Sequence, residues 1–185
     1  MFHEGDAGTQ LHLIDSGRVA VRVTTPLGDV ATLTILGAGD VLGEGALIGA
    51  GERSATAVAL EKTETIAVGR AEFDDLRVRH PTVERFLTAV LAAQVRRLSA
   101  QLIEALYVPA ERRVLRRLVE VCHVYGVADG EVVVPLTQEH LASLAGTTRP
   151  TANRVLRDAQ DAGLVTLARG AVTVMDVARL RDRSR

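Results

Sequence analysis

The stretch that decides the fold runs from Leu136 to Leu156 and reads LTQEHLASLAGTTRPTANRVL. A threonine followed by a glutamate two residues later is typical of a helix start, so Thr137 is predicted to cap a first helix. Gly146 permits a tight turn, and either Thr147 or Thr148 then caps a second helix. The stretch therefore predicts two helices joined by a tight turn.

The second predicted helix has an apolar face and a polar face. Val155, Leu156 and Ala159 have helical spacing and are expected to pack inward. Pro150 lies in the first turn, where its missing amide hydrogen costs little. A helix with one buried face leaves its other face available to a partner.

Two arginines on the polar face indicate the kind of partner. Arg149, Asn153 and Arg154 are expected to project freely, and arginine suits guanine, whose O6 and N7 accept two hydrogen bonds from one guanidinium. The polar face is therefore predicted to enter a DNA major groove, with an ordinary solvated helix face as the alternative. The candidate DNA-binding residues are Thr148, Arg149, Thr151, Asn153, Arg154 and Arg169.

A short hairpin is predicted directly after the second helix. Residues 163–167 read GLVTL, Arg169-Gly170 forms a turn, and residues 171–174 read AVTV. This hairpin is placed like the wing of a winged helix-turn-helix. Arg169 at its tip is expected to contact phosphate.

A long helix is predicted upstream of this domain, beginning near Pro81. Apolar residues recur along it at steps of four and three, which is typical of a dimerising coiled coil. These residues are Leu91, Val95, Leu98, Leu102 and Ala105, whereas Arg96 and Arg97 fall off the seam. The alternative is an amphipathic helix packed on its own domain, because the seam spans only about two heptads.

Pro109 interrupts the helical pattern, and we expect a hinge and a domain boundary over residues 107–109. A further amphipathic helix is predicted over residues 111–125, with Cys122 as a small core residue. The expected domains are residues 1–80, a dimerisation helix and hinge over residues 81–108, and a DNA-binding domain over residues 109–185.

The first third of the chain has a strand-like pattern. Residues 11–14 and 18–23 alternate around a turn at Gly17 and predict a hairpin, and further short strands are expected over residues 30–36, 54–60 and 65–68. Several short strands at regular spacing predict a β-sandwich or barrel. The fold class is accordingly α+β, with a jelly-roll-like β-roll, a long helix and a C-terminal winged helix-turn-helix.

A glycine-rich turn lies inside the predicted β-roll. Gly43 and Glu44 are followed after a short loop by Arg53 and Ser54. Backbone amides and a guanidinium can together cradle a phosphate, and Glu44 can accept a hydrogen bond from a ribose hydroxyl. On the residues alone, a charged surface loop with an internal Glu–Arg pair is an equal alternative.

Charge and cysteine content narrow the possible functions. The net charge is −1, but the basic residues are concentrated towards the C-terminus, so only that part is expected to face a polyanion. One cysteine, no secretion signal and no long apolar run favour a cytoplasmic protein without a membrane partner. No nucleophile with a paired base, metal-ligand spacing or Walker-type loop is present, which disfavours an enzyme.

Residues 136–174 resemble the winged helix of the Crp/Fnr (cyclic AMP receptor protein) family of bacterial transcription regulators. The resemblance implies a homodimer on a pseudo-palindromic double-stranded DNA operator, with RNA polymerase as a further partner. Family members read bases with arginines at the positions of Arg149 and Arg154 and with a glutamate where this chain has Pro150. Proline accepts no hydrogen bond from a cytosine amino group, so the family's usual operator is not carried over.

The glycine-rich turn resembles the phosphate-binding cassette of cyclic nucleotide-binding domains. This resemblance assigns Gly43 and Glu44 to the ribose, Arg53 and Ser54 to the cyclic phosphate, and Ser99 to the base. Cyclic AMP is the leading allosteric ligand, and no metal is expected. Leu98 stands where the best-known member has a second hydroxyl residue, so the identity of the base stays open.

The same resemblance leaves three alternatives. One is a regulator with this scaffold that binds DNA without a nucleotide or with another ligand. Another, in a different class, is a cyclic nucleotide-binding module that regulates a protein partner. An iron–sulfur sensor is excluded by the single cysteine, and haem is the weakest alternative. The motif at residues 3–6 normally follows an initial helix and strand, so we expect the β-roll to start short.

Overall fold

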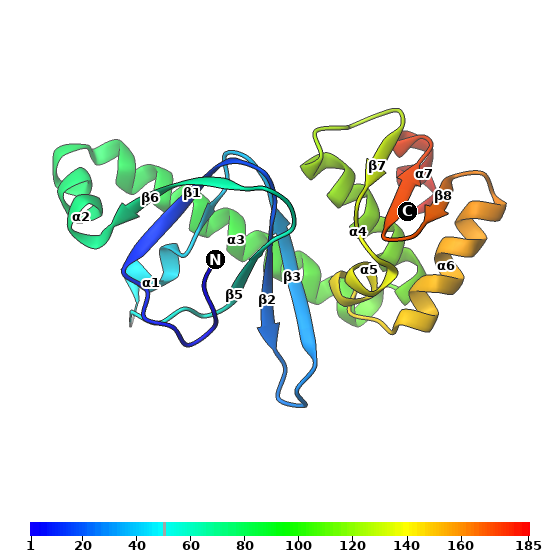
Figure 1. The fold of residues 1–185 in the computed structure, drawn as a ribbon, viewed down its shortest axis with the longest axis horizontal. Helices are drawn as coiled ribbons and strands as arrows, with labels where there is room; N and C mark the ends of the chain where they lie inside the picture. Colours follow the sequence, from blue (N-terminus) through cyan, green and yellow to red (C-terminus); the bar gives the residue numbers. More distant parts are fainter. Residues whose placement is uncertain (50) are drawn as a thin grey trace. The chain divides into compact units, whose positions relative to one another are not determined.

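The computed structural model describes residues 1–49 and 51–185. They form two compact units, an N-terminal unit of Met1–Val23 and Leu36–Ile103 and a C-terminal unit of Thr24–Ile35 and Glu104–Arg185. Figure 1 shows the strands of the β-roll and the helices of the C-terminal unit, coloured along the sequence from blue to red. The α+β class, with a β-rich N-terminal part, a long helix and a C-terminal winged helix-turn-helix, is confirmed.

Two three-stranded sheets form the β-roll. Their orders are β4-β1-β6 and β3-β2-β5. The strands are β1 (Gln10–Ser16), β2 (Val19–Thr24), β3 (Val30–Leu36), β4 (Val41–Leu42), β5 (Thr56–Ala59) and β6 (Glu64–Gly69). The strands predicted over residues 30–36, 54–60 and 65–68 are thus present within a few residues of their expected bounds.

The hairpin predicted around Gly17 is wrong. Strands β1 and β2 lie in different sheets, because both edges of β1 are taken, by β4 and by β6. Gly17 has φ +85°, and an added Cβ would lie 2.5 Å from the carbonyl oxygen of Lys62. The turn is therefore pressed against residues 62–63 and carries the chain from one sheet to the other.

Three helices complete the N-terminal part. They are α1 (Glu44–Ile48), α2 (Arg70–Arg79) and the long α3 (Pro81–Tyr107). One apolar cluster joins these helices to strand β1 through Leu11, Leu47, Phe73 and Leu87. A second cluster, of Ile14, Val19, Leu42 and Ala57, lies between the two sheets. The first cluster fixes α1, and hence the glycine-rich turn before it, against α3.

Residues 110–183 of the C-terminal unit form four helices and a small antiparallel sheet of order β7-β9-β8. These elements are α4 (Ala110–Val124), β7 (Val132–Val134), α5 (Gln138–Leu144), α6 (Arg149–Asp161), β8 (Val165–Ala168), β9 (Ala171–Val174) and α7 (Val177–Arg183). Helix α4 buries one face, including Val114, Leu118 and Cys122, none of which has any exposed surface. The expectation that Cys122 is a core residue is confirmed.

Candidate nucleic-acid interface and ligand cassette

Helices α5 and α6 form the helix-turn-helix, and both begin at threonine caps. The Thr137 side chain accepts a hydrogen bond from the backbone N–H of His140 at 3.1 Å. The Thr148 hydroxyl accepts from the N–H of Thr151 at 3.4 Å, so Thr148 and not Thr147 caps α6. Gly146 has φ +57°, a left-handed conformation that glycine adopts at little cost.

The inward face of α6 is the one predicted. Val155, Leu156 and Ala159 are buried, and Ala152 joins them. Pro150 lies at the start of the helix, where the N–H that proline lacks would have no intrahelical acceptor. Burial of this face fixes which α6 side chains point to solvent.

Arg149 is exposed and borders a groove of about 310 Å³ between the helix-turn-helix and the wing. The wing turn supplies Arg169 and Gly170, and the start of α5 supplies Thr137 and Gln138. Two guanidinium groups beside a hydroxyl and an amide form a surface suited to a phosphodiester backbone. Glu139 also lines the groove and is the acidic exception.

Asn153 is half-buried and Arg154 is exposed, but each has a constraint that the sequence did not indicate. The Oδ1 atom of Asn153 is buried and has no hydrogen-bond partner among residues 1–49 and 51–185. Nη2 of Arg154 donates to Oε1 of Glu111 at 2.7 Å. The pair is open to water, with 58% of the Arg154 side chain and 47% of the Glu111 side chain exposed.

Glu111 was missed by sequence reasoning because it lies 43 residues from Arg154. It occupies the first turn of α4, where backbone N–H groups favour an anion. Backbone hydrogen bonding and then the bond from Arg154 hold the pKa of the Glu111 carboxyl below its usual range. Glu111 is therefore charged at neutral pH.

The chain between α3 and α4 is tied to the helix-turn-helix by one arginine. Arg113 donates to the carbonyl oxygens of Val108 at 2.8 Å, Ala145 at 2.9 Å and Gly146 at 3.0 Å. Helix α3 ends at Tyr107 and α4 begins at Ala110, on either side of the predicted break at Pro109. The hinge carbonyl and the turn between α5 and α6 therefore share one guanidinium.

The glycine-rich turn precedes a short helix and a buried acid. Gly43 has φ +80° and stands at the N-terminus of α1. Glu44 is only 9% exposed. Its withdrawal from water raises the pKa of its carboxyl, and the positive charges of Arg97 and Arg53 partly oppose that shift. A buried carboxylate held near two arginines can accept a hydrogen bond from a ligand hydroxyl.

Arg53 faces the protein interior and not an open phosphate site. Its nitrogens donate to the carbonyl oxygens of Gly43 at 3.0 Å and Gln10 at 2.7 Å, and its guanidinium lies 4.0 Å from the centre of the Phe2 ring. Only 5% of the residue is exposed. Gly43 has φ +80°, a conformation that residues with a Cβ rarely adopt, and an added Cβ would also lie 2.1 Å from Arg53 Nη1.

The two serines of the predicted ligand site are exposed. Ser54 follows Arg53 directly, and Ser99 lies on α3. Glu44 and Arg53 lie close enough for each charge to act on the other, and within residues 1–49 and 51–185 no hydrogen bond links either serine to them. Arg97, which sequence reasoning placed simply off the seam, is the α3 residue whose charge reaches Glu44.

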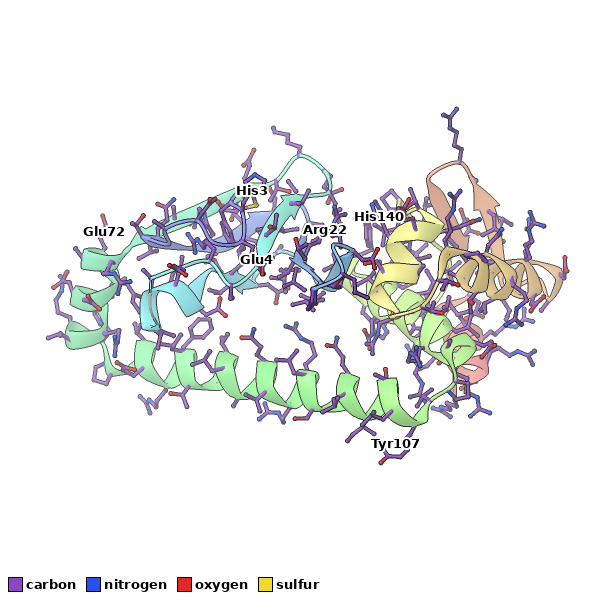
Figure 2. The ribbon with its side chains drawn as sticks, turned by 90° about the horizontal axis from the view of Figure 1, so that it is seen from below. His3, Glu4, Arg22, Glu72, Tyr107 and His140 are labelled. Atoms are coloured by element: carbon purple, nitrogen blue, oxygen red, sulfur yellow. The ribbon has the colours of Figure 1, made fainter. Side chains whose placement is uncertain are left out.

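An apolar stripe on α3 is exposed. Val95, Leu98 and Leu102 of the predicted seam are 62%, 46% and 61% exposed, whereas Leu91 packs on the first apolar cluster. Tyr107, at the end of α3, points away from the ribbon (Figure 2). The second half of the seam is thus not packed on its own chain.

Metal-binding clusters and membrane-spanning helices are both missing from the described part of the chain. Among residues 1–49 and 51–185, no three histidine, cysteine, aspartate or glutamate side chains are grouped so as to hold a metal ion. None of the helices formed by these residues combines the length and apolar character needed to span a bilayer.

Known proteins resemble this chain over nearly its whole length. Residues 1–80 match the family of cyclic nucleotide-binding domains, and residues 112–183 match the Crp-like helix-turn-helix domains. The cyclic AMP receptor protein of Thermus thermophilus is 37% identical over 185 residues, which span 98% of this chain and 82% of that protein. A CRP-like cAMP-activated global transcriptional regulator of Mycobacterium tuberculosis is 30% identical, with 100% and 84% of the two chains covered.

Solved structures agree with this assignment. The Thermus thermophilus catabolite activator protein has 36% sequence identity and a TM-score of 0.53, covering all of this chain and 84% of that one. A second regulator of the CRP family from the same organism shares the fold with a TM-score of 0.81, 24% identity and coverage of 100% and 92%. These relatives are transcription regulators. The chain belongs to the Crp/Fnr (cyclic AMP receptor protein) family of transcription regulators.

Proposed function

We propose that this regulator binds a pseudo-palindromic DNA operator as a homodimer, with α6 in the major groove and the wing on the phosphate backbone. The observation that carries the proposal is the groove between α5, α6 and the wing, which gathers Arg149, Arg169 and the Thr137 cap on one surface. Thr148 and Thr151 lie at the exposed start of α6 and are proposed as further contacts. Arg154 is proposed to read a base, and Asn153 is a weaker candidate because its amide oxygen is buried.

The proposed dimer interface is the exposed stripe of α3. Val95, Leu98 and Leu102 present an apolar surface at alternating steps of three and four, as two helices packed in a coiled coil require. Paired subunits would place two reading helices on half-sites about 10 bp apart, or a multiple of that spacing. The domain limits of residues 1–80, 81–108 and 109–185, and RNA polymerase as a partner, remain part of this proposal.

The β-roll is proposed to bind a cyclic nucleotide, with cyclic AMP as the first ligand to test. Glu44 suits a ribose hydroxyl, because it is a buried carboxylate at the start of α1. Ser54 is exposed and available to a phosphate. Arg53 is the obstacle, since it is only 5% exposed and two of its nitrogens are bonded to main-chain carbonyls. Its Nε is buried and has no hydrogen-bond partner among residues 1–49 and 51–185, so the guanidinium must become accessible before it can bind a phosphate.

That inward position of Arg53 favours a second candidate, a regulator of the same family that binds DNA without a nucleotide. The guanidinium already satisfies the carbonyls of Gly43 and Gln10 and stacks on Phe2. A residue used in this way stabilises the β-roll with no ligand present. The two candidates differ in one measurable respect, which is whether a cyclic nucleotide stabilises the fold.

The deciding experiment is thermal unfolding with cyclic AMP, cyclic GMP and 5′-AMP. A ligand at a hundredfold excess over its Kd adds about 2.7 kcal/mol to the free energy of unfolding. Arg53→Ala is a poor test because it strips two partly buried main-chain carbonyls of their donor. Ser54→Ala and Glu44→Gln are preferable, and each is expected to reduce the stabilisation by cyclic AMP. No stabilisation by any nucleotide would support the second candidate.

A further inference from the structure

The arginine proposed to read a base, Arg154, is bound to a carboxylate from another helix. Arg154 donates through Nη2 to a single oxygen of Glu111, and the first turn of α6 contains no acidic residue of its own. The counter-charge of this arginine is therefore supplied by α4, which begins directly after the α3–α4 break.

The geometry of the pair allows an exchange of partners. Both side chains are half exposed, and pairs of this kind stabilise a protein by only about 0–1 kcal/mol. Glu111 uses one bond from one nitrogen, whereas a guanine offers two acceptors to the guanidinium. A base that accepts two hydrogen bonds can therefore displace the carboxylate.

Releasing Arg154 from Glu111 leaves a carboxylate without a counter-charge beside an approaching DNA backbone. The Glu111 carboxylate is open to solvent on the side of α4 that reaches α6, so DNA phosphates approaching α6 would be repelled by it. Such repulsion is felt least when Arg154 neutralises Glu111 and most after Arg154 has left. Breaking the Glu111–Arg154 pair therefore costs free energy in the DNA complex, and this cost opposes the contact between Arg154 and DNA.

We propose that Glu111 competes with DNA for Arg154, so that it sets how strongly this arginine binds the operator. The proposal rests on the proposed function, namely that Arg154 contacts DNA. A residue that instead positioned Arg154 in the complex would have the opposite effect on affinity when it is removed. The sign of one substitution therefore separates the two roles.

The test is a double-mutant cycle of Glu111→Gln and Arg154→Ala, read by fluorescence anisotropy at fixed salt. The probe is a duplex selected from a random pool by the wild-type protein, with an unrelated duplex of equal length beside it. Glu111→Gln is expected to tighten operator binding. The gain in affinity should be about two- to fivefold smaller when Arg154 is alanine.

Glu139→Gln is the matched control, because it removes one carboxylate from the groove beside Arg149 without touching the Glu111–Arg154 pair. Its effect on affinity is expected to be the same with and without Arg154. Thermal unfolding of each variant checks that the C-terminal unit is intact.

Two results would overturn the proposal while leaving the proposed function standing. One is an equal gain from Glu111→Gln in both backgrounds, which would make Glu111 a general repulsive charge. The other is weaker operator binding, which would make it a positioning residue. If Arg154→Ala leaves operator affinity unchanged, the reading role of Arg154 is itself wrong and the inference fails with it.

Discussion

At the scale of single residues, Arg53 shows how burial changes the meaning of a motif. A sequence of arginine and serine after a glycine-rich turn indicates a phosphate site, because both side chains donate hydrogen bonds to phosphate oxygens. In the structure the guanidinium instead satisfies two main-chain carbonyls and contacts Phe2. Phe2 lies 51 positions earlier in the chain, so no local pattern could have revealed this contact.

His12 provides a pH-dependent contribution to stability. Burial, and then the charges of Arg53 and the N-terminus, lower the pKa of its imidazole from the usual 6.5. Below pH 6.5 the unfolded chain therefore binds more protons than the folded one, so stability falls as the pH falls from 6.5 towards the lowered folded pKa. We predict that the midpoint of thermal unfolding falls more steeply from pH 7.5 to 5.5 in wild type than in His12→Gln. Parallel pH profiles of the two proteins would contradict the account.

Cys122 is predicted to be inert in the native protein. Burial raises the pKa of its thiol to about 12, and the residue has no exposed surface. The thiolate is the reactive form, so a chromogenic disulfide reagent at pH 8 should react only with the unfolded chain. Rapid reaction without denaturant would show that α4 opens readily, and reaction in guanidinium chloride confirms that the thiol is intact.

At the scale of elements, the helix-turn-helix could be predicted from sequence and part of the β-roll could not. Thr137, Gly146 and the apolar positions of α6 act within a few residues of one another, so local spacing identifies them. The strand partners of β1 come from residues 41–42 and 64–69, and alternation alone does not say which strands pair. This is why the short link at Gly17 was mistaken for a hairpin turn.

In the DNA-binding and ligand sites, too, local features could be predicted from the sequence and long-range side-chain partners could not. Caps and buried positions on α6 follow from helix periodicity, and they were located correctly. The bonds of Arg154 with Glu111 and of Arg113 with the turn carbonyls, and the charge of Arg97 acting on Glu44, join distant positions of the chain. Ionic and hydrogen-bond partners of long side chains depend on tertiary packing, which one sequence does not specify.

The cap of α6 can be tested by a pair of threonine substitutions. Thr148 accepts a hydrogen bond from an otherwise unbonded N–H, whereas Thr147 lies one residue before the cap. Thr148→Ala is expected to lower the free energy of unfolding by about 0.5–2 kcal/mol, and Thr147→Ala by less. Urea denaturation measures both values. A larger loss for Thr147→Ala would mean that α6 begins one residue earlier.

At the scale of the whole molecule, the exposed apolar stripe of α3 is the feature that a single chain leaves unexplained. Val95, Leu98 and Leu102 would be costly to leave in water as a continuous patch. Burial against a second copy of the same helix would remove that cost. A dimer is also what two symmetric DNA half-sites require.

A charge placed on this stripe should separate the subunits. Leu102→Glu puts two carboxylates near the proposed dimer axis, so light scattering coupled to size exclusion should change from a dimer mass to a monomer mass. Val78→Glu is the control, because Val78 is an apolar residue of α2 that is 84% exposed and lies outside the stripe. A dimer that survives Leu102→Glu would place the interface elsewhere.

The central claim, that α6 reads DNA for a dimeric regulator, is tested most directly by selecting bound duplexes from a random DNA pool and sequencing them. The account predicts enriched inverted half-sites about 10 bp apart or a multiple of it, with a guanine whose preference is lost in Arg154→Ala. Recovery of a single unpaired half-site, or of no preferred sequence at all, would contradict it.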